Sequence, residues 1–351
     1  PSPGTTGNDI IIPGDGDDTL YGDPFDLRPL VRDHGGNDIL SATGEYNTLF
    51  GDAQEMSGGA RGGNDRLTVA GHVNYVSGDA YAMTGDARGG SDRLTATGAN
   101  NLLVGDALFT LSDNARGGDD CLTVTGETGR VTGDADSMYG DARGGNDRLT
   151  ATGDFCTLQG DANLMFDHAH GGDDHLTAKG DYNSVFGDAF SMYGDTRGGD
   201  DRVTATGDQF SILAGDGYSM FDNARGGDGR VIGGKGGDFV VGDAQVMSAT
   251  ARGGDDLLWG DRVGAAAGGE DTFLFAGHFA RDTILDFRPG EGDRIQLEGY
   301  GFDDVGDLTV AIRGGSTVID IGASLGEADN VTTIRLQGFH ETLTNADFVF
   351  T

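Results

Sequence analysis

GDARGGNDRLTATG, residues 140–153, recurs at residues 85–98 with Ser91 in place of the asparagine. The phrase belongs to a unit that returns every 27 or 28 residues. Its second glycine falls at Gly36, Gly63, Gly90, Gly118, Gly145, Gly172, Gly199, Gly227 and Gly254. A Gly-Asp pair keeps the same spacing, and all seven methionines occupy one position of the unit, where Leu111 fills the remaining slot. A fixed period in this range indicates an array of structural repeats.

The apolar residues of each unit fall into three columns. One follows the repeated aspartate (Leu94, Leu149), one lies two residues before the Gly-Asp pair (Leu103), and one is the methionine column. Segments such as LTATG alternate with the period of two that half-buried strands show, and Gly, Asp and Asn mark the corners between them. The sequence therefore predicts an all-β fold, a parallel β-solenoid of the β-roll or β-helix kind with coils of about 27 residues and three strands each. A helical repeat is disfavoured because each Gly costs about 1 kcal/mol relative to Ala in a helix.

Composition restricts the function. The 351 residues include 65 Gly, 58 acidic and 23 basic side chains, for a formal net charge of −35. Nucleic acid is an unexpected partner, because its binding depends on basic side chains. No run approaches the ~18 apolar residues of a membrane span, and the first residues lack the features of a secretory signal peptide. Cys121 and Cys156 are expected to lie too far apart for a disulfide.

The aspartate before each core leucine forms a column if the coils stack. Carboxylates about 4.8 Å apart repel by roughly 1 kcal/mol in water and about 3–4 kcal/mol at an effective dielectric near 20, so positive charge must lie among them. Ca²⁺, which accepts six to eight oxygen ligands, is one candidate. A ladder of the adjacent arginines is the other, but the coil 133–159 carries five aspartates against Arg143 and Arg148. We expect Ca²⁺ in at least some of these turns, and the arginine ladder stays open as the alternative.

Two stretches resemble a known family. GNDIIIPGDGDDTL (7–20) places Asp9 and Asp18 nine residues apart, and GGKGGDFVV (233–241) fits the nonapeptide G-G-x-G-x-D-x-U-x in full. Both are similar to the haemolysin-type calcium-binding repeats of the RTX family, in which turns of a parallel β-roll clamp Ca²⁺. The ARGGND turns depart from the nonapeptide, and the 27-residue period departs from the 18-residue coil of that roll.

The tail after about residue 260 loses the 27-residue spacing and resembles the C-terminal region of serralysin-type RTX exoproteins. The resemblance implies RTX-like β-roll turns over 1–34, the 27-residue solenoid over 35–262, and a β-rich cap with a type I secretion region over 263–351. It also implies a secreted bacterial protein that folds on external calcium, with the type I secretion machinery as a partner. Combined with the column, it gives these expected metal ligands: Asp9, Asp18, Asp38, Asp65, Asp92, Asp120, Asp147, Asp174, Asp201, Asp238, Asp256 and Asp271.

Other functions stay open at this point. Pairs such as Thr123/Thr125 and Thr150/Thr152 are expected to face outward in two columns, which resembles the ice-binding face of some β-solenoids and also suits a polysaccharide or a cell surface. A polysaccharide lyase or epimerase is a further alternative, although no catalytic constellation stands out and activity as an enzyme is uncertain. His168, His170 and His175 either gather a transition metal or replace ordinary polar residues of the repeat. The principal prediction is a secreted calcium-binding structural solenoid.

Overall fold

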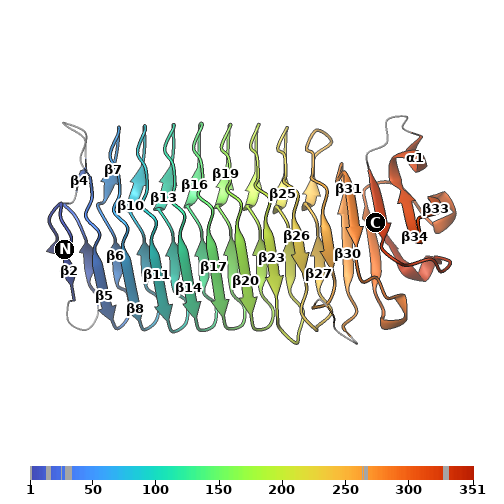
Figure 1. The fold of residues 1–351 in the computed structure, drawn as a ribbon, viewed down its shortest axis with the longest axis horizontal. Coiled ribbons are helices and arrows are strands. Elements are labelled where there is room, and N and C mark those ends of the chain that lie inside the picture. The colour runs from blue at the N-terminus through green and yellow to red at the C-terminus, as the bar shows by residue number, and fades with distance from the viewer. Residues whose placement is uncertain are drawn as a thin grey trace.

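The structure is a computed structural model that describes residues 2–12, 17–24, 26–27, 34–262, 264, 268–326 and 332–351. Part of the first RTX-like stretch, residues 13–16, lies outside this range. Stacked coils form a rod with the N-terminal coils at one end and the C-terminal strands at the other (Figure 1). The predicted fold class is confirmed: the chain is a parallel β-solenoid of about 10 turns with about 27 residues per turn.

Three sheets run along the rod, because most coils contribute one strand to each. The 13-stranded sheet consists, in order, of β1 (Ser2–Pro3), β3 (Thr19–Tyr21), β6 (Thr48–Phe50), β9 (Tyr75–Ser77), β12 (Leu102–Val104), β15 (Arg130–Thr132), β18 (Thr157–Gln159), β21 (Ser184–Phe186), β24 (Ile212–Ala214), β27 (Phe239–Val241), β30 (Thr272–Ala276), β32 (Arg294–Glu298) and β36 (Phe348–Phe350). The nine-stranded sheet consists of β28 (Ala244–Met247), β25 (Gly217–Met220), β22 (Ala189–Met192), β19 (Ala162–Met165), β16 (Ala135–Met138), β13 (Ala107–Leu111), β10 (Ala80–Met83), β7 (Glu55–Met56) and β4 (Asp26–Leu27).

The third sheet has 14 strands and carries the T-x-T segments. Its order is β2 (Ile10–Ile11), β5 (Ile39–Thr43), β8 (Arg66–Ala70), β11 (Arg93–Thr97), β14 (Cys121–Thr125), β17 (Arg148–Thr152), β20 (His175–Lys179), β23 (Arg202–Ala205), β26 (Arg230–Ile232), β29 (Leu257–Trp259), β31 (Arg281–Ile284), β35 (Thr333–Leu336), β34 (Ser316–Asp320) and β33 (Thr309–Arg313). The helical elements are η1 (Pro289–Glu291), η2 (Val305–Asp307), α1 (Ile321–Leu325) and η3 (Asn345–Asp347).

The register places equivalent residues of successive coils beside one another. Leu94 of β11 pairs with Leu67 of β8 on one side and with Leu122 of β14 on the other. Each of these strands alternates between buried and exposed residues, because side chains of a strand point to opposite faces. The stacking of like residues that the repeat predicts is therefore present.

Three clusters of buried apolar residues are present, and two of them are large cores that run along the coils. The leucine core fills the space between the 13- and 14-stranded sheets and includes Leu67, Leu103 and Val131. The methionine core lies in a narrower lobe under the nine-stranded sheet and consists of the methionines, Leu111 and stacked alanines such as Ala60. Figure 1 shows these lobes as narrow loops along the upper side of the rod.

The parallel pairing continues beyond residue 262. β27 pairs with β30, β30 with β32, and β32 with β36, all in parallel. Antiparallel pairing enters only at β33–β34 and β34–β35 among the strands that the structure describes. These strands follow on β31 at the C-terminal end of the 14-stranded sheet.

Candidate metal centre

Each coil narrows where the chain enters and leaves the lobe. The chain enters through a Gly-Asp corner, as at Gly51–Asp52, and leaves through a Gly-Gly-x-Asp corner, as at 62–65. The N–H of Gly63 lies 3.2 and 3.1 Å from the two carboxylate oxygens of Asp52, and this hydrogen bond ties the two corners together. We call this narrow part the neck. It separates the leucine core from the methionine core.

The first aspartate column of the neck lies at the start of the strands of the 14-stranded sheet, from β2 to β31. Asp65 Oδ1 accepts the backbone N–H of Asp38 at 2.7 Å, and Asp92 Oδ1 accepts that of Asp65 at 2.6 Å. This column consists of Asp9, Asp38, Asp65, Asp92, Asp120, Asp147, Asp174, Asp201, Asp256 and Asp282, with Gly229 in the gap before Asp256. The predicted stacking of these aspartates is present, and their binding of metal stays a prediction.

A second aspartate column faces the first, and sequence reasoning missed it. Its members come from the Gly-Asp corners: Asp23, Asp52, Asp79, Asp106, Asp134, Asp161, Asp188, Asp216, Asp243 and Asp261. Each accepts a hydrogen bond from a glycine 8–13 residues further on, as Asp134 does from Gly145 at 2.7 Å. The sequence signal was present, since an acidic residue at a fixed position between buried strands needs a partner.

The neck holds carboxylate oxygens that receive no hydrogen bond. Among the described residues, 15 buried oxygens of the two columns lack any donor: Oδ1 of Asp23 and Oδ2 of Asp38, Asp65, Asp92, Asp106, Asp120, Asp134, Asp147, Asp161, Asp174, Asp188, Asp201, Asp216, Asp256 and Asp282. Buried polar atoms in native proteins nearly always have a partner. A file of such oxygens along the whole rod is therefore a candidate binding site.

Glycine makes the close approach of the two columns possible. A Cβ atom at Gly51 would lie 2.1 Å from Oδ2 of Asp65, and one at Gly62 would lie 1.7 Å from Oδ1 of Asp79. Any other residue at these corners would push the carboxylates out of the neck. The repeated glycines thus bring the acidic groups of both corners into one narrow space.

Burial raises the pKa of these carboxyl groups. Loss of water is the largest cause for Asp38, whose pKa rises to about 7, and for Asp65, whose pKa rises to about 8. For Asp52, burial raises the pKa well above its ordinary value, and the charges of Asp79 and Asp65 raise it further. At neutral pH the neck therefore requires either bound protons or bound cations to offset its charge.

Arginine does not supply that positive charge. Among the described residues, one ion pair joins a neck aspartate to an arginine, Asp261 to Arg288 at 3.0 Å. The arginines of the repeat, such as Arg61 and Arg88, are exposed on the outside of the coil. The arginine ladder that the sequence left open is thus absent from the described part of the neck.

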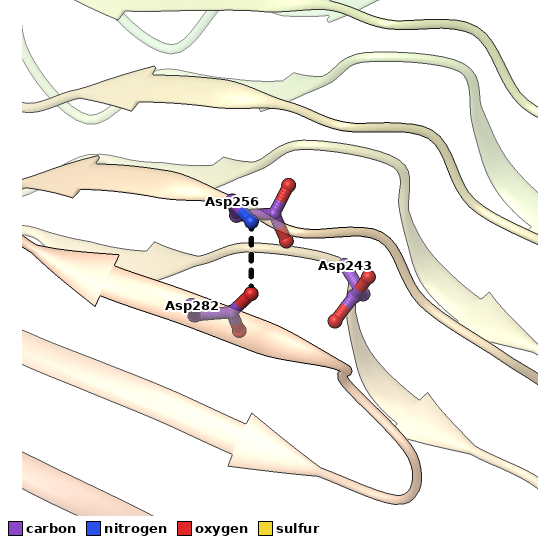
Figure 2. Close-up of side chains that lie close together, drawn as sticks. All are labelled: Asp243, Asp256 and Asp282. Carbon is purple, nitrogen blue, oxygen red and sulfur yellow. Dashed lines mark hydrogen bonds between the residues drawn. The ribbon is translucent and has the colours of Figure 1, made fainter. Parts of the chain in front are cut away.

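Three carboxylates near the C-terminal end of the neck form the tightest group. Asp243 precedes β28, Asp256 precedes β29 and Asp282 lies in β31; each offers an oxygen within 4.8 Å of the others, and all three are buried. Figure 2 shows the backbone N–H of Asp256 donating to Asp282, at 2.9 Å, with the carboxylate of Asp243 beside them. In the part of the chain that the structure describes, no other group of three His, Cys, Asp or Glu residues is this close.

Three expected ligands lie in a different corner. Asp18, Asp238 and Asp271 belong to a column between the 14- and 13-stranded sheets. We call it the asparagine column: Asp18, Asn47, Asn74, Asn101, Gly129, Cys156, Asn183, Ser211, Asp238, Asp271 and Asp293. Its C-terminal end is acidic, and Oδ2 of Asp271 is buried without a hydrogen-bond donor. The structure thus divides the predicted ligands between two corners.

The histidines and cysteines occupy ordinary positions of the repeat. His175 pairs with Arg148 and Arg202 in the 14-stranded sheet, and His170 forms bridges to arginines of both neighbouring coils. Neighbouring arginines and burial lower the pKa of both histidines, with burial the larger cause. His168, His170 and His175 are not a close metal-binding group among the described residues. Both cysteines are free thiols.

The T-x-T pairs form columns in the 14-stranded sheet. Thr123 pairs with Thr95 and Thr150, and the outer residues Thr125 and Thr152 are exposed. No helix in the described ranges has the length and apolar character needed to cross a membrane. No protein-family model matches the chain, and a search of curated proteins finds no similar sequence. The resemblance to the RTX family therefore stays a prediction.

Proposed function

We propose that this chain is a calcium-binding structural solenoid in which a row of Ca²⁺ ions occupies the neck. The observation that carries the proposal is the file of 15 buried carboxylate oxygens without hydrogen-bond donors. A cation between adjacent coils gives these oxygens a partner and offsets their mutual repulsion. It also links the two corners of the neck and so joins the leucine core to the methionine core.

The donor set favours calcium over other metals. The neck offers carboxylate oxygens without imidazole or thiolate, and hard cations prefer oxygen ligands. Ca²⁺ binds oxygens at 2.3–2.6 Å, so opposite ligands are separated by about 5 Å. The oxygens of Asp243, Asp256 and Asp282, within 4.8 Å of one another, suit this distance. Mg²⁺ requires shorter, near-octahedral coordination and usually keeps several waters, so it fits a row of buried carboxylates less well.

The biological setting of the proposal is that of the RTX family. Its support is the nonapeptide at 233–241 and the paired aspartates Asp9 and Asp18. In this setting the chain is a secreted module that stays unfolded while calcium is scarce and folds outside the cell. Metal binding couples to folding in this way because the neck does not exist in the unfolded chain.

Calcium binding is tested by a matched pair of double variants. In Asp120→Asn/Asp174→Asn both changes lie in the neck, whereas in Asp119→Asn/Asp173→Asn the same change is made one residue earlier, on the exposed surface. We expect equilibrium dialysis with elemental analysis to find several Ca²⁺ per chain, fewer in the neck variant and an unchanged number in the control. Equal loss in both variants, or no calcium bound to the native chain, would contradict the proposal.

Recognition of an ordered surface such as ice is a second candidate function. The register of Thr95, Thr123 and Thr150 and the exposure of Thr125 and Thr152 favour it, because they give regularly spaced hydroxyl and methyl groups. Thermal hysteresis of the native protein, lost in Thr125→Leu/Thr152→Leu, would establish this function. Absence of hysteresis in the calcium-loaded protein would eliminate it.

A further inference from the structure

Arginine side chains line the corner through which the chain leaves each lobe. The residue before each Gly-Gly pair forms a column joined by parallel bridges: His34, Arg61, Arg88, Arg116, Arg143, His170, Arg197, Arg225 and Arg252. A second basic column begins the strands of the 14-stranded sheet and includes Arg66, Arg93 and Arg148. Both columns follow the rod axis at the spacing of the coils, about 4.8 Å.

Four exposed arginines of this column have no side-chain partner among the residues that the structure describes. Within the described ranges, Arg61, Arg88, Arg116 and Arg143 are exposed and take part in no ion pair and no side-chain hydrogen bond. Arginine that stabilises a fold commonly pairs with a carboxylate. A row of unpaired guanidiniums is therefore available to a ligand.

Along the rod, the positive charge of these basic columns is concentrated in the coils nearer the N-terminus. The segments 57–66, 84–93, 112–121 and 139–148, which we call the arginine ridge, carry seven arginines against four exposed aspartates (Asp86, Asp113, Asp119 and Asp141). The equivalent segments of the next four coils, 166–175, 193–202, 221–230 and 248–257, carry five arginines against seven exposed aspartates. The ridge is thus a local cationic surface on a chain whose net charge is −35.

A polar groove runs across the coils of the ridge. One side is lined by Arg88, Arg116, Arg143 and His170, and the other by Asp86, Asn114 and Asp141. The basic side suits carboxylates, which guanidinium binds through paired charge-assisted hydrogen bonds. The other side suits hydroxyl groups, because carboxylate and amide oxygens accept hydrogen bonds from them. The groove has no aromatic side chain on which a nucleic-acid base would stack.

We propose that the arginine ridge binds an extended acidic polysaccharide with a carboxylate on each sugar. The chain lies along the rod axis, so that each sugar residue, whose length is close to the coil spacing, places its carboxylate at one coil. This inference goes beyond calcium binding and uses the exposed arginine side chains of these segments, not their buried neck aspartates. Each exposed contact is weak alone, so affinity depends on several contacts made at once.

The test measures binding of oligouronates of two to eight sugar residues to the full chain. The protein is first loaded with calcium, and the unbound calcium is then removed. We expect calorimetry at low salt to show affinity rising with length up to about five residues, the number of basic side chains from Arg61 to His170, and then levelling off. Added salt is expected to weaken binding, because exposed charges are screened. No binding, or affinity that does not depend on length, would overturn the proposal.

Matched triple variants locate the site. Arg88→Gln/Arg116→Gln/Arg143→Gln is expected to weaken binding at least tenfold. The same change at Arg197, Arg225 and Arg252 removes equal charge from the acidic continuation and is expected to change affinity less than twofold. Equal loss in both triples would show that net charge alone attracts the ligand and would overturn the proposal.

Two control experiments identify the chemistry of the ligand and check that the variants remain folded. Oligothymidylate of the same length is expected to bind at least tenfold more weakly, and equal affinity would exclude recognition of a polysaccharide. Calcium content and thermal unfolding of both triples are expected to match the native chain, because the substituted arginines are exposed and, among the described residues, form no ion pair with a neck aspartate. Should the native chain bind no calcium, the comparison of the triples would still decide the role of the ridge.

Discussion

Asn47, Asn74 and Asn101 of the asparagine column and most aspartates of the neck are buried polar side chains stacked at corners of the same coils, but only the asparagines satisfy one another. Asn47 Nδ2 donates to Asn74 Oδ1 at 2.9 Å, and Asn74 Nδ2 donates to Asn101 Oδ1 at 3.0 Å. Asp65 uses Oδ1 to accept a backbone N–H, while its buried Oδ2 has no donor in the described residues. An amide carries its own donor and a carboxylate does not. The neck therefore needs a partner from outside the chain, whereas these three asparagines need none.

The largest expected effect is that of metal removal on stability at different pH values, because it acts on the carboxylates of the neck and not on the stacked asparagines. Raised pKa values of about 7 for Asp38 and about 8 for Asp65 mean that the metal-free folded chain holds protons that the unfolded chain has released. Stability of the metal-free protein should thus be highest near or below pH 4 and be lost as the pH rises through about 7–8. Calcium reverses the trend, because it binds the ionised carboxylates.

Thermal unfolding followed by circular dichroism checks this expectation at pH 5 and pH 8. Each site contributes about 2.7 kcal/mol when calcium exceeds its dissociation constant a hundredfold, and several sites together rival the whole stability of a typical domain. We expect the metal-free protein at pH 8 to lose its cooperative transition, while calcium restores it. Melting curves with the same pH dependence with and without calcium would exclude cations from the neck.

A charge placed among the stacked asparagines of the asparagine column is the next most damaging change. Asn74→Asp removes the donor to Asn101. One oxygen of the new carboxylate still accepts from Asn47, but the other is left without a donor and the charge is buried without a counter-ion, which should cost about 3–5 kcal/mol. Asn146→Asp is the control, because Asn146 lies in an exposed column that already contains Asp119 and Asp173. It should change stability by less than about 0.5 kcal/mol. Chemical denaturation with calcium present measures both, and equal effects would mean that the interior tolerates charge at either corner.

Replacing neck aspartates by asparagine is the converse change, and it should raise the stability of the metal-free protein. Asp120→Asn/Asp174→Asn removes two buried charges from the neck and should stabilise the metal-free protein by about 1–3 kcal/mol per site. The surface pair Asp119→Asn/Asp173→Asn should leave it nearly unchanged. Denaturation at pH 8 after exhaustive dialysis against metal-free buffer compares the two. A neck variant less stable than the control would show that these carboxylates form favourable contacts within the protein.

Local sequence was sufficient where one residue type repeats at one position. The period placed Leu67, Leu94 and Leu122 in one stacked column, and the aspartates before them in another. It also placed Cys156 among the asparagines, where its N–H donates to Asn183. Stacking of coils converts the period directly into neighbours, and no further knowledge of the tertiary structure is needed for such contacts.

The sequence alone determined the coil, its columns and the excess of buried acid, because a 27-residue period with fixed glycines permits few other arrangements. Only the tertiary structure decided which corners meet. Asp52 and Asp65 are 13 residues apart and become neighbours because the lobe between them folds back on its own methionine core. Asp18, Asp238 and Asp271 resemble the other aspartates in sequence yet lie at a different corner, since the path of each coil, rather than the motif, sets the direction of a side chain.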